Sequence, residues 1–127
     1  MFKIPDFNST DIFAGGPDPS PIIEKYGGWH MNPSNVMFTN GQFDPWRSFT
    51  VRSEDTQLGA PRRQLVQDIP ACNVAPGKDT VFGVTYPGQV HEQDIKGDVS
   101  DESSPLRVGL DLYSAALDKW LPFFEVK

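Results

Sequence analysis

The sequence predicts an α/β fold, in which helices cover a small parallel sheet. Two short, β-rich apolar runs lie far apart in the chain, one at 35–39 and one at 80–84. A helical pattern comes before the first run, and a longer one comes after the second. Since two strands do not make a sheet that is stable alone, we expect the domain to be incomplete as a stand-alone unit.

The first helix is predicted at 20–26. Ser20 is a favoured N-cap residue, and Pro21 suits the first helical position. The pair Gly27-Gly28 ends the helix. Residues 1–19 are interrupted by glycine and proline and are predicted to be an irregular N-terminal segment.

The two strands are bounded by turn residues. The run 35–39 breaks into Asn40-Gly41, and the run 80–84 is followed by a Pro-Gly turn. Between them, residues 47–79 are predicted to be mostly loop, with one helical turn at 62–67.

The last element is an amphipathic helix at 105–124, opened by Ser104 as N-cap and by Pro105. Apolar residues recur at steps of three and four, which is the helical period. They are Leu106, Leu110, Tyr113, Leu117, Trp120, Leu121 and Phe124. This face needs an apolar surface to cover it.

Composition narrows the class of protein. The net charge of −6 argues against nucleic acid or an anionic membrane as partner. No apolar stretch is long enough to span a membrane. A hydrophobic fraction of 38%, with 12 Pro and 11 Gly, indicates one small domain with much loop.

Metal, cofactor and modification signals are few. Cys72 is the only cysteine, and the two histidines have no zinc-binding spacing, so we expect neither metal nor cofactor. Asn8 begins a glycosylation sequon, usable only in a secreted protein. The first residues show no signal peptide.

The candidate catalytic residues follow the two predicted strands. Asp44 follows the first strand on a loop stiffened by Pro45, and His91 follows the second. Because parallel strands end side by side at one edge of a sheet, this Asp and His are expected to meet. An aspartate so placed orients the histidine and stabilises its protonated form. Their order matches the last two members of an α/β-hydrolase triad.

The nucleophile of such a triad is missing. No serine lies in the G-x-S-x-G pattern that places a nucleophile between a strand and a helix. Cys72 lies in a loop without that setting.

Segment 35–46, which ends in Asn-Gly-Gln-Phe-Asp-Pro-Trp, resembles the triad-aspartate segment of the prolyl carboxypeptidase and dipeptidyl peptidase II family of serine peptidases. Segment 26–29, Tyr-Gly-Gly-Trp, is similar to the aromatic-Gly-Gly segment that precedes that strand in the family. Segment 91–95 resembles its H-x-x-D-L motif, and the closing helix also matches. The proline-rich loops look most like fungal members.

The resemblance implies that residues 20–127 are the C-terminal portion of an α/β-hydrolase peptidase domain. It implies catalytic roles for Asp44 and His91, peptide substrates for the full-length parent, and a substrate-pocket role for Trp46, whose simpler interpretation is packing. Asp94 of the H-x-x-D-L match is interpreted as capping the next segment. Family members are secreted or lysosomal, whereas this chain shows no targeting signal.

Departures from the family leave alternatives open. Val90 stands where many members have a second histidine, and the serine segment is absent, which suggests a C-terminal fragment. The chain is then either the triad Asp and His segment of an exopeptidase or a non-catalytic remnant that associates through the apolar face of its last helix. The end of another α/β-hydrolase, such as a serine carboxypeptidase or lipase, is a third interpretation.

Overall fold

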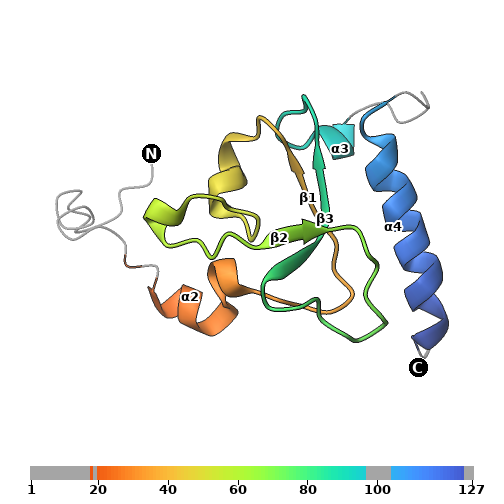
Figure 1. Ribbon diagram of the computed structural model, residues 1–127, viewed down its shortest axis with the longest axis horizontal. Helices are drawn as coiled ribbons and strands as arrows, with labels where there is room; N and C mark the ends of the chain where they lie inside the picture. The colour runs from red at the N-terminus through yellow and green to blue at the C-terminus, as the bar shows by residue number, and fades with distance from the viewer. Residues whose placement is uncertain (1–17, 19, 97–103, 125–127) are drawn as a thin grey trace, which may run out of the picture.

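The computed structural model describes residues 18, 20–96 and 104–124. A three-stranded parallel sheet lies at its centre, and its strands are β1 (Phe38–Gly41), β2 (Gln64–Val66) and β3 (Thr80–Tyr86). The helix α4 (Arg107–Trp120) lies on one side of this sheet, and α2 (Ser20–Tyr26) lies on the other (Figure 1). The architecture is α/β in character, as the sequence predicted; its assignment to the hydrolase fold stays a prediction.

Strand β3 is the centre of the sheet, in the order β1-β3-β2. Phe38 is paired with Gly83, and Gly41 with Tyr86. On the other side of β3, Gln64 is paired with Thr80. A side chain at Gly83 would overlap the backbone of Phe38, so the close approach of the two strands requires glycine there.

The helical turn predicted at 62–67 is wrong, because this segment contains β2. Arg62 has a φ of 52°, which is outside the right-handed helical region. Pairing with β3 then fixes an extended conformation that a three-residue segment does not reveal by itself. Here tertiary pairing overrides local propensity.

The first strand begins and ends later than predicted. Asn35 has a φ of 55°, so the extended pairing begins only at Phe38. It then continues through Asn40-Gly41, which the sequence had assigned to a turn. The strand therefore ends directly before the loop that carries Asp44.

The first helix is confirmed at Ser20–Tyr26, and it leads into a short 3₁₀ helix, η1 (Gly28–His30). The following loop is held by the buried Arg63, whose Nη2 donates to the carbonyl oxygens of Trp29 at 2.9 Å and Met31 at 2.8 Å. Burial lowers the pKa of this guanidinium. Arg63 thus connects the approach to β1 with the approach to β2.

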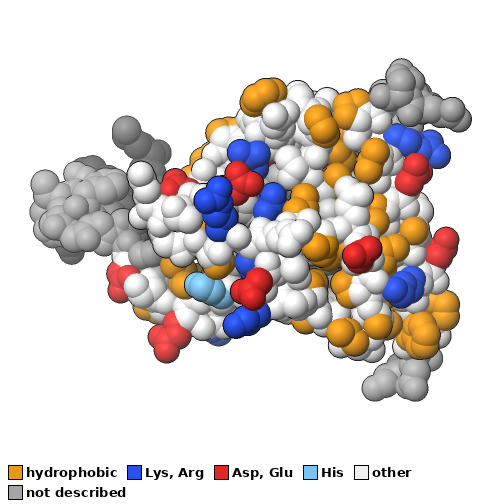
Figure 2. Space-filling view, in the orientation of Figure 1, with side chains coloured by type: hydrophobic (Ala, Val, Ile, Leu, Met, Phe, Trp, Pro, Cys, Tyr) orange, Lys and Arg blue, Asp and Glu red, His pale blue; other side chains and the backbone are white. Residues whose placement is uncertain are grey.

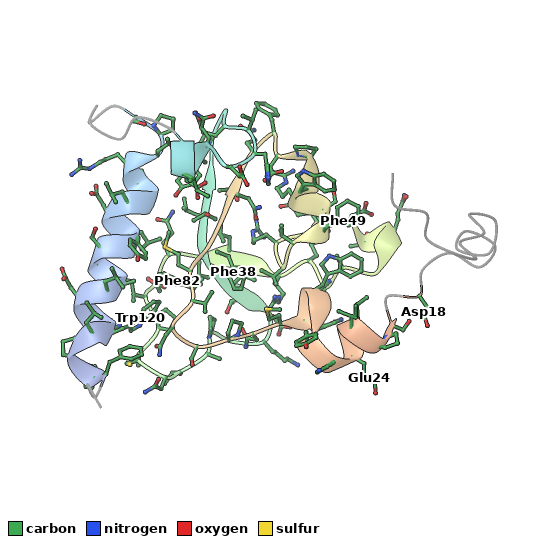
Figure 3. The ribbon with its side chains drawn as sticks, turned by 180° about the vertical axis from the view of Figure 1, so that it is seen from behind. Asp18, Glu24, Phe38, Phe49, Phe82 and Trp120 are labelled. Carbon is green, nitrogen blue, oxygen red and sulfur yellow. The ribbon has the colours of Figure 1, made fainter. Side chains whose placement is uncertain are left out.

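The core lies between α4 and the sheet. Phe82 and Ala116 are fully buried, and Trp120 packs edge-on against Phe82 with 5.8 Å between ring centroids. Figure 3 shows Phe82 on the sheet facing Trp120 on the helix. The indole Nε1 donates to the carbonyl of Pro70 at 2.9 Å, so the buried polar group is satisfied.

The predicted helix at 105–124 exists, but α4 ends at Trp120 and continues as the 3₁₀ helix η4 (Leu121–Phe123), which contains Pro122. Proline lacks the N–H that an α-helix needs. At the other end, α4 begins at Arg107, two residues later than predicted, with Leu106 and not Ser104 at the N-cap position; Ser104 Oγ accepts a hydrogen bond from the Leu106 N–H at 3.3 Å in the turn before it. No described helix has the length and apolar content that crossing a membrane requires.

The buried face of α4 is rotated from the predicted one. Buried residues of α4 are Gly109, Ala116 and Trp120, and only the last belongs to the predicted apolar set. Small residues at 109 and 116 let the helix approach the sheet closely. A side chain at Gly109 would overlap the ring of Tyr86, whose pKa is raised to about 12 by burial and by the nearby charge of Asp94. Of the predicted apolar set, Leu106 before the helix and Trp120 are buried and Leu117 is half-buried, whereas the exposed members are Leu110, Tyr113, Leu121 and Phe124.

Candidate active site

Asp44 and His91 lie at the carboxyl ends of the two paired strands β1 and β3. Both strands end at the same edge of the sheet, at the top of Figure 1. Asp44 comes three residues after the end of β1, and His91 five residues after the end of β3. Parallel pairing therefore brings together two residues that are far apart in the chain.

Three hydrogen bonds from backbone N–H groups join the two loops, in addition to the contact between Asp44 and His91. The N–H of Gln42 donates to the carbonyl of Tyr86 at 3.0 Å, and the N–H of Phe43 donates to that of Gln89 at 2.9 Å. In return, the N–H of Gly88 donates to Oε1 of Gln42 at 2.8 Å. The loop that carries Asp44 is thus fixed against the loop that carries His91.

Gly41 allows this close approach. A Cβ atom at Gly41 would overlap the carbonyl oxygen of Val90 and lie 2.6 Å from that of Gln89. Both are backbone atoms of the histidine loop, which cannot turn aside as a flexible side chain could. Glycine is needed here to let the two loops meet.

The Gly41→Ala variant is expected to lose about 1–3 kcal/mol of unfolding free energy, as overpacked sites do. The added methyl group must push the 89–90 backbone away from β1. Urea unfolding followed by tryptophan fluorescence measures the change. The matched control is Gly77→Ala, because the nearest atom there is Thr80 Oγ1 at 3.4 Å. Equal stability of the two variants would contradict the steric role of position 41.

The histidine and the aspartate form a hydrogen-bonded pair. Nδ1 of His91 lies 3.0 Å from Oδ2 of Asp44. The other carboxylate oxygen, Oδ1, accepts from the backbone N–H of Trp46 at 2.8 Å. The Asp44 side chain is only 5% exposed, whereas that of His91 is 47% exposed. A buried carboxylate thus orients one nitrogen of a half-exposed imidazole ring.

Asp44 is stabilised as the carboxylate. Burial acts to raise its pKa, but the hydrogen bond and charge of His91 and the N–H of Trp46 outweigh it. The side chain of Asn40 acts in the same direction, and the net pKa lies below its ordinary value. Asp44 is therefore ionised at neutral pH and able to accept the Nδ1 proton of His91.

His91 lines a cleft of about 220 Å³ together with Trp46, Thr50 and Glu92. The carboxylate of Glu92 lies 3.6 Å from Nε2, longer than an ordinary hydrogen bond. A histidine that is oriented through Nδ1 and lines a cleft can act as a general base through Nε2.

Trp46 lies beside the pair, in the 3₁₀ helix η2 (Pro45–Phe49). Its side chain is 57% exposed and contacts the ring of Phe49, with 6.1 Å between centroids. Phe43, on the same loop, is 64% exposed. The residues around Asp44 thus present an open aromatic surface next to the cleft, and the tryptophan is not part of the buried core.

Asp94 accepts a hydrogen bond from the sheet, and its role as a cap stays a prediction. It lies in the first turn of the short helix α3 (Gln93–Lys96), and its Oδ2 accepts a hydrogen bond from Thr39 Oγ1 at 2.6 Å. This bond connects the segment after His91 to β1. Sequence reasoning missed both this bond and that of Gln42 to Gly88, because each joins residues far apart in the chain.

No group of three His, Cys, Asp or Glu side chains in the described part of the chain is arranged to hold a metal ion. Asn8, the predicted glycosylation site, lies outside the described residues. The catalytic roles of Asp44 and His91 and the substrate role of Trp46 stay predictions, supported by the geometry above.

The chain is similar in part to two fungal serine proteases of Bipolaris victoriae (strain FI3). It is 41% identical to the serine protease vicPb over 46 residues, which are 36% of this chain and 9% of that protein. It is 56% identical to the serine protease vicPa over 27 residues, 21% of this chain and 5% of that protein. No family model matches, and no solved structure matches.

These short matches indicate a relation to serine proteases and a peptidase-like origin. The matched segments account for less than a tenth of either relative. Matches of this length show a common origin and not the activity of a whole protease.

Proposed function

We propose that this chain is the segment of a serine-type peptidase that supplies the general base and its orienting carboxylate. The observation that carries the proposal is the 3.0 Å contact between His91 Nδ1 and Asp44 Oδ2 at the ends of adjacent parallel strands. The partial similarity to fungal serine proteases supports the same class of reaction.

In this mechanism His91 Nε2 takes the proton of a serine hydroxyl as the serine attacks the peptide carbonyl. Asp44 keeps the proton of the ring on Nδ1 and stabilises the imidazolium that forms. His91 then returns the proton to the leaving amine, and a second cycle with water releases the acyl group. The serine comes from a part of the protease outside these 127 residues, in which no serine lies in a G-x-S-x-G pattern.

The substrate class we propose is peptides cleaved next to proline by an exopeptidase. Trp46 forms an exposed aromatic wall of the cleft at His91, and a proline ring packs well on such a surface. The resemblance of 40–46 to the prolyl carboxypeptidase and dipeptidyl peptidase II family favours the same specificity.

A chimera tests this function. Residues 20–124 of this chain are exchanged into vicPb around the 46-residue segment in which the two are similar. Hydrolysis of peptides with and without proline at the cleavage site is measured, together with labelling by a fluorophosphonate. We expect labelling and hydrolysis, both lost in His91→Ala. A folded chimera that neither labels nor hydrolyses would refute the function. Equal rates on both kinds of peptide would refute the proline preference alone.

A second candidate function is a non-catalytic interaction fragment. The exposed apolar residues of the last helix favour it, since Leu121 is 57% exposed and Phe124 53% exposed. In that case the Asp44–His91 pair takes no part in catalysis. The chimera that carries His91→Ala then has the same activity as the unmodified chimera.

A further inference from the structure

The cleft beside His91 is acidic. Its described lining includes three carboxylates, and no Lys or Arg side chain is among those residues. Asp44 is buried and bonded to His91, whereas Asp94 accepts the hydrogen bond of Thr39. Glu92 differs from both, because its side chain is 44% exposed and its carboxylate oxygen lies 3.6 Å from Nε2 of His91. It is therefore the carboxylate that a molecule entering the cleft meets next to the proposed base.

The backbone of Glu92 has an unusual conformation. Its φ of 54° lies in the left-handed region, which residues other than glycine, asparagine and aspartate seldom adopt. Its carbonyl accepts a hydrogen bond from the N–H of Ile95 at 3.1 Å, in the turn that leads into α3. Strained residues of this kind cluster at functional sites. Glu92 is therefore a candidate for a role in the reaction beyond that of a turn residue.

The proposed reaction brings the leaving group to Nε2 of His91. Because this nitrogen returns its proton to the leaving amine, the amine must lie within hydrogen-bond reach of it, about 3 Å. The amine is then no more than about 7 Å from the carboxylate oxygen of Glu92, which is within the screening length of about 8 Å at physiological ionic strength. The charge of Glu92 consequently acts on the residue that leaves with the amine.

We infer that Glu92 selects substrates by the charge on the leaving side of the bond that is cut. A lysine or arginine directly after this bond is attracted, whereas an aspartate or glutamate there is repelled. A free carboxylate on a single released residue is repelled as well, since only the α-carbon separates it from the amine. This inference rests on the proposed function, because it names the specificity of that same site.

The same charge favours one direction of exopeptidase action. A carboxypeptidase releases one residue, whose free carboxylate would lie close to Glu92, and the described lining offers no cation to bind it. An exopeptidase that works from the amino end releases the remaining chain, whose carboxylate is remote. On the face shown in Figure 2, the uppermost surface, at the edge where β1 and β3 end, is mainly hydrophobic, so apolar contacts are available to that chain. The parent enzyme is therefore expected to remove short segments from amino ends.

The chimera of residues 20–124 in vicPb tests this inference. Its kcat/KM is measured on two peptides that are identical except for the residue after the cut, which is lysine or glutamate. We expect a preference for lysine of about tenfold, which falls as salt is added, because a half-exposed charge is screened. Glu92→Gln should reduce the preference to less than about twofold, and Glu92→Lys should reverse it.

The matched control is Glu24→Gln, which removes the same charge from α2. Glu24 is exposed and lies away from the edge where β1 and β3 end (Figure 3). The preference should stay within about twofold of that of the unmodified chimera. A second pair of peptides releases a single residue that ends in an amide or in a free carboxylate. The amide should be cleaved about tenfold faster, and Glu92→Gln should remove most of this difference.

Failure of this inference can be told apart from failure of the proposed function. An active chimera without a preference for lysine, or with one that Glu92→Gln leaves unchanged, overturns the inference alone. A folded chimera that does not label with the fluorophosphonate refutes the proposed function. The full 127-residue chain then decides the charge selection. Lysine amide, and not glutamate amide acetylated at its amino group, should shift the NMR resonances of the His91 ring, and Glu92→Gln should abolish the shift. The absence of any shift would refute the charge selection too.

Discussion

Asp44→Asn is expected to lower the turnover of the active chimera by about 10⁴, as removal of the orienting carboxylate does in serine proteases. The amide cannot stabilise the imidazolium at 3.0 Å from Nδ1, and its NH₂ group favours the wrong tautomer of His91. Substrate binding should change little, so the loss is expected in kcat and not in KM. Steady-state hydrolysis of a proline-containing peptide measures both constants.

The matched control for this substitution is Asp111→Asn. Asp111 forms an exposed i,i+4 pair with Arg107 at 2.9 Å on α4, remote from the cleft. Its substitution should leave kcat within twofold, since such surface pairs contribute little. An Asp44→Asn enzyme that retains more than a tenth of the turnover would mean that Asp44 does not orient the base.

Phe82→Ala is expected to destabilise the chain by about 3–5 kcal/mol, the range for removing a buried aromatic side chain. The ring is fully buried and packs edge-on against Trp120, so its loss leaves a cavity between α4 and the sheet. For a small domain whose total stability is of the order of 5–15 kcal/mol, this is a large fraction. The free energy of unfolding in urea, followed by circular dichroism, measures it.

Phe123→Ala provides the comparison, because that side chain is 68% exposed in η4. It should change the stability by less than about 0.5 kcal/mol, as surface substitutions do. Similar losses for the two phenylalanines would contradict the position of the core between α4 and β3.

The sequence predicted those parts of the structure whose signals are local. Helix 20–26 followed from Ser20, Pro21 and the Gly27-Gly28 stop, and the strand of 80–84 from its β-rich residues. The meeting of Asp44 and His91 followed from one non-local rule, that parallel strands end at the same edge. That rule sufficed because both residues follow their strands closely.

The remaining features depend on contacts between distant segments. β2 is only three residues long, and it is extended because β3 pairs with it. Periodicity located the apolar face of α4, but Gly109 and Ala116 determine which side meets the sheet, because small residues allow the closest approach. The bond from Thr39 to Asp94 spans 55 residues, and the bond from the backbone N–H of Gly88 to the Gln42 side chain spans 46, beyond any local pattern.

The hydrogen bonds between the two loops have an evolutionary consequence. The side chain of Gln42 accepts a hydrogen bond from the N–H of Gly88, and the backbone of residues 89–90 fills the space beside Gly41. A substitution in one loop is therefore accommodated only if the other changes with it. In an alignment of related proteins, we expect positions 41–43 to co-vary with positions 88–90, and insertions to be excluded from both. The two loops are thus expected to be inherited as a single unit, although the separate strands β1 and β3 carry them.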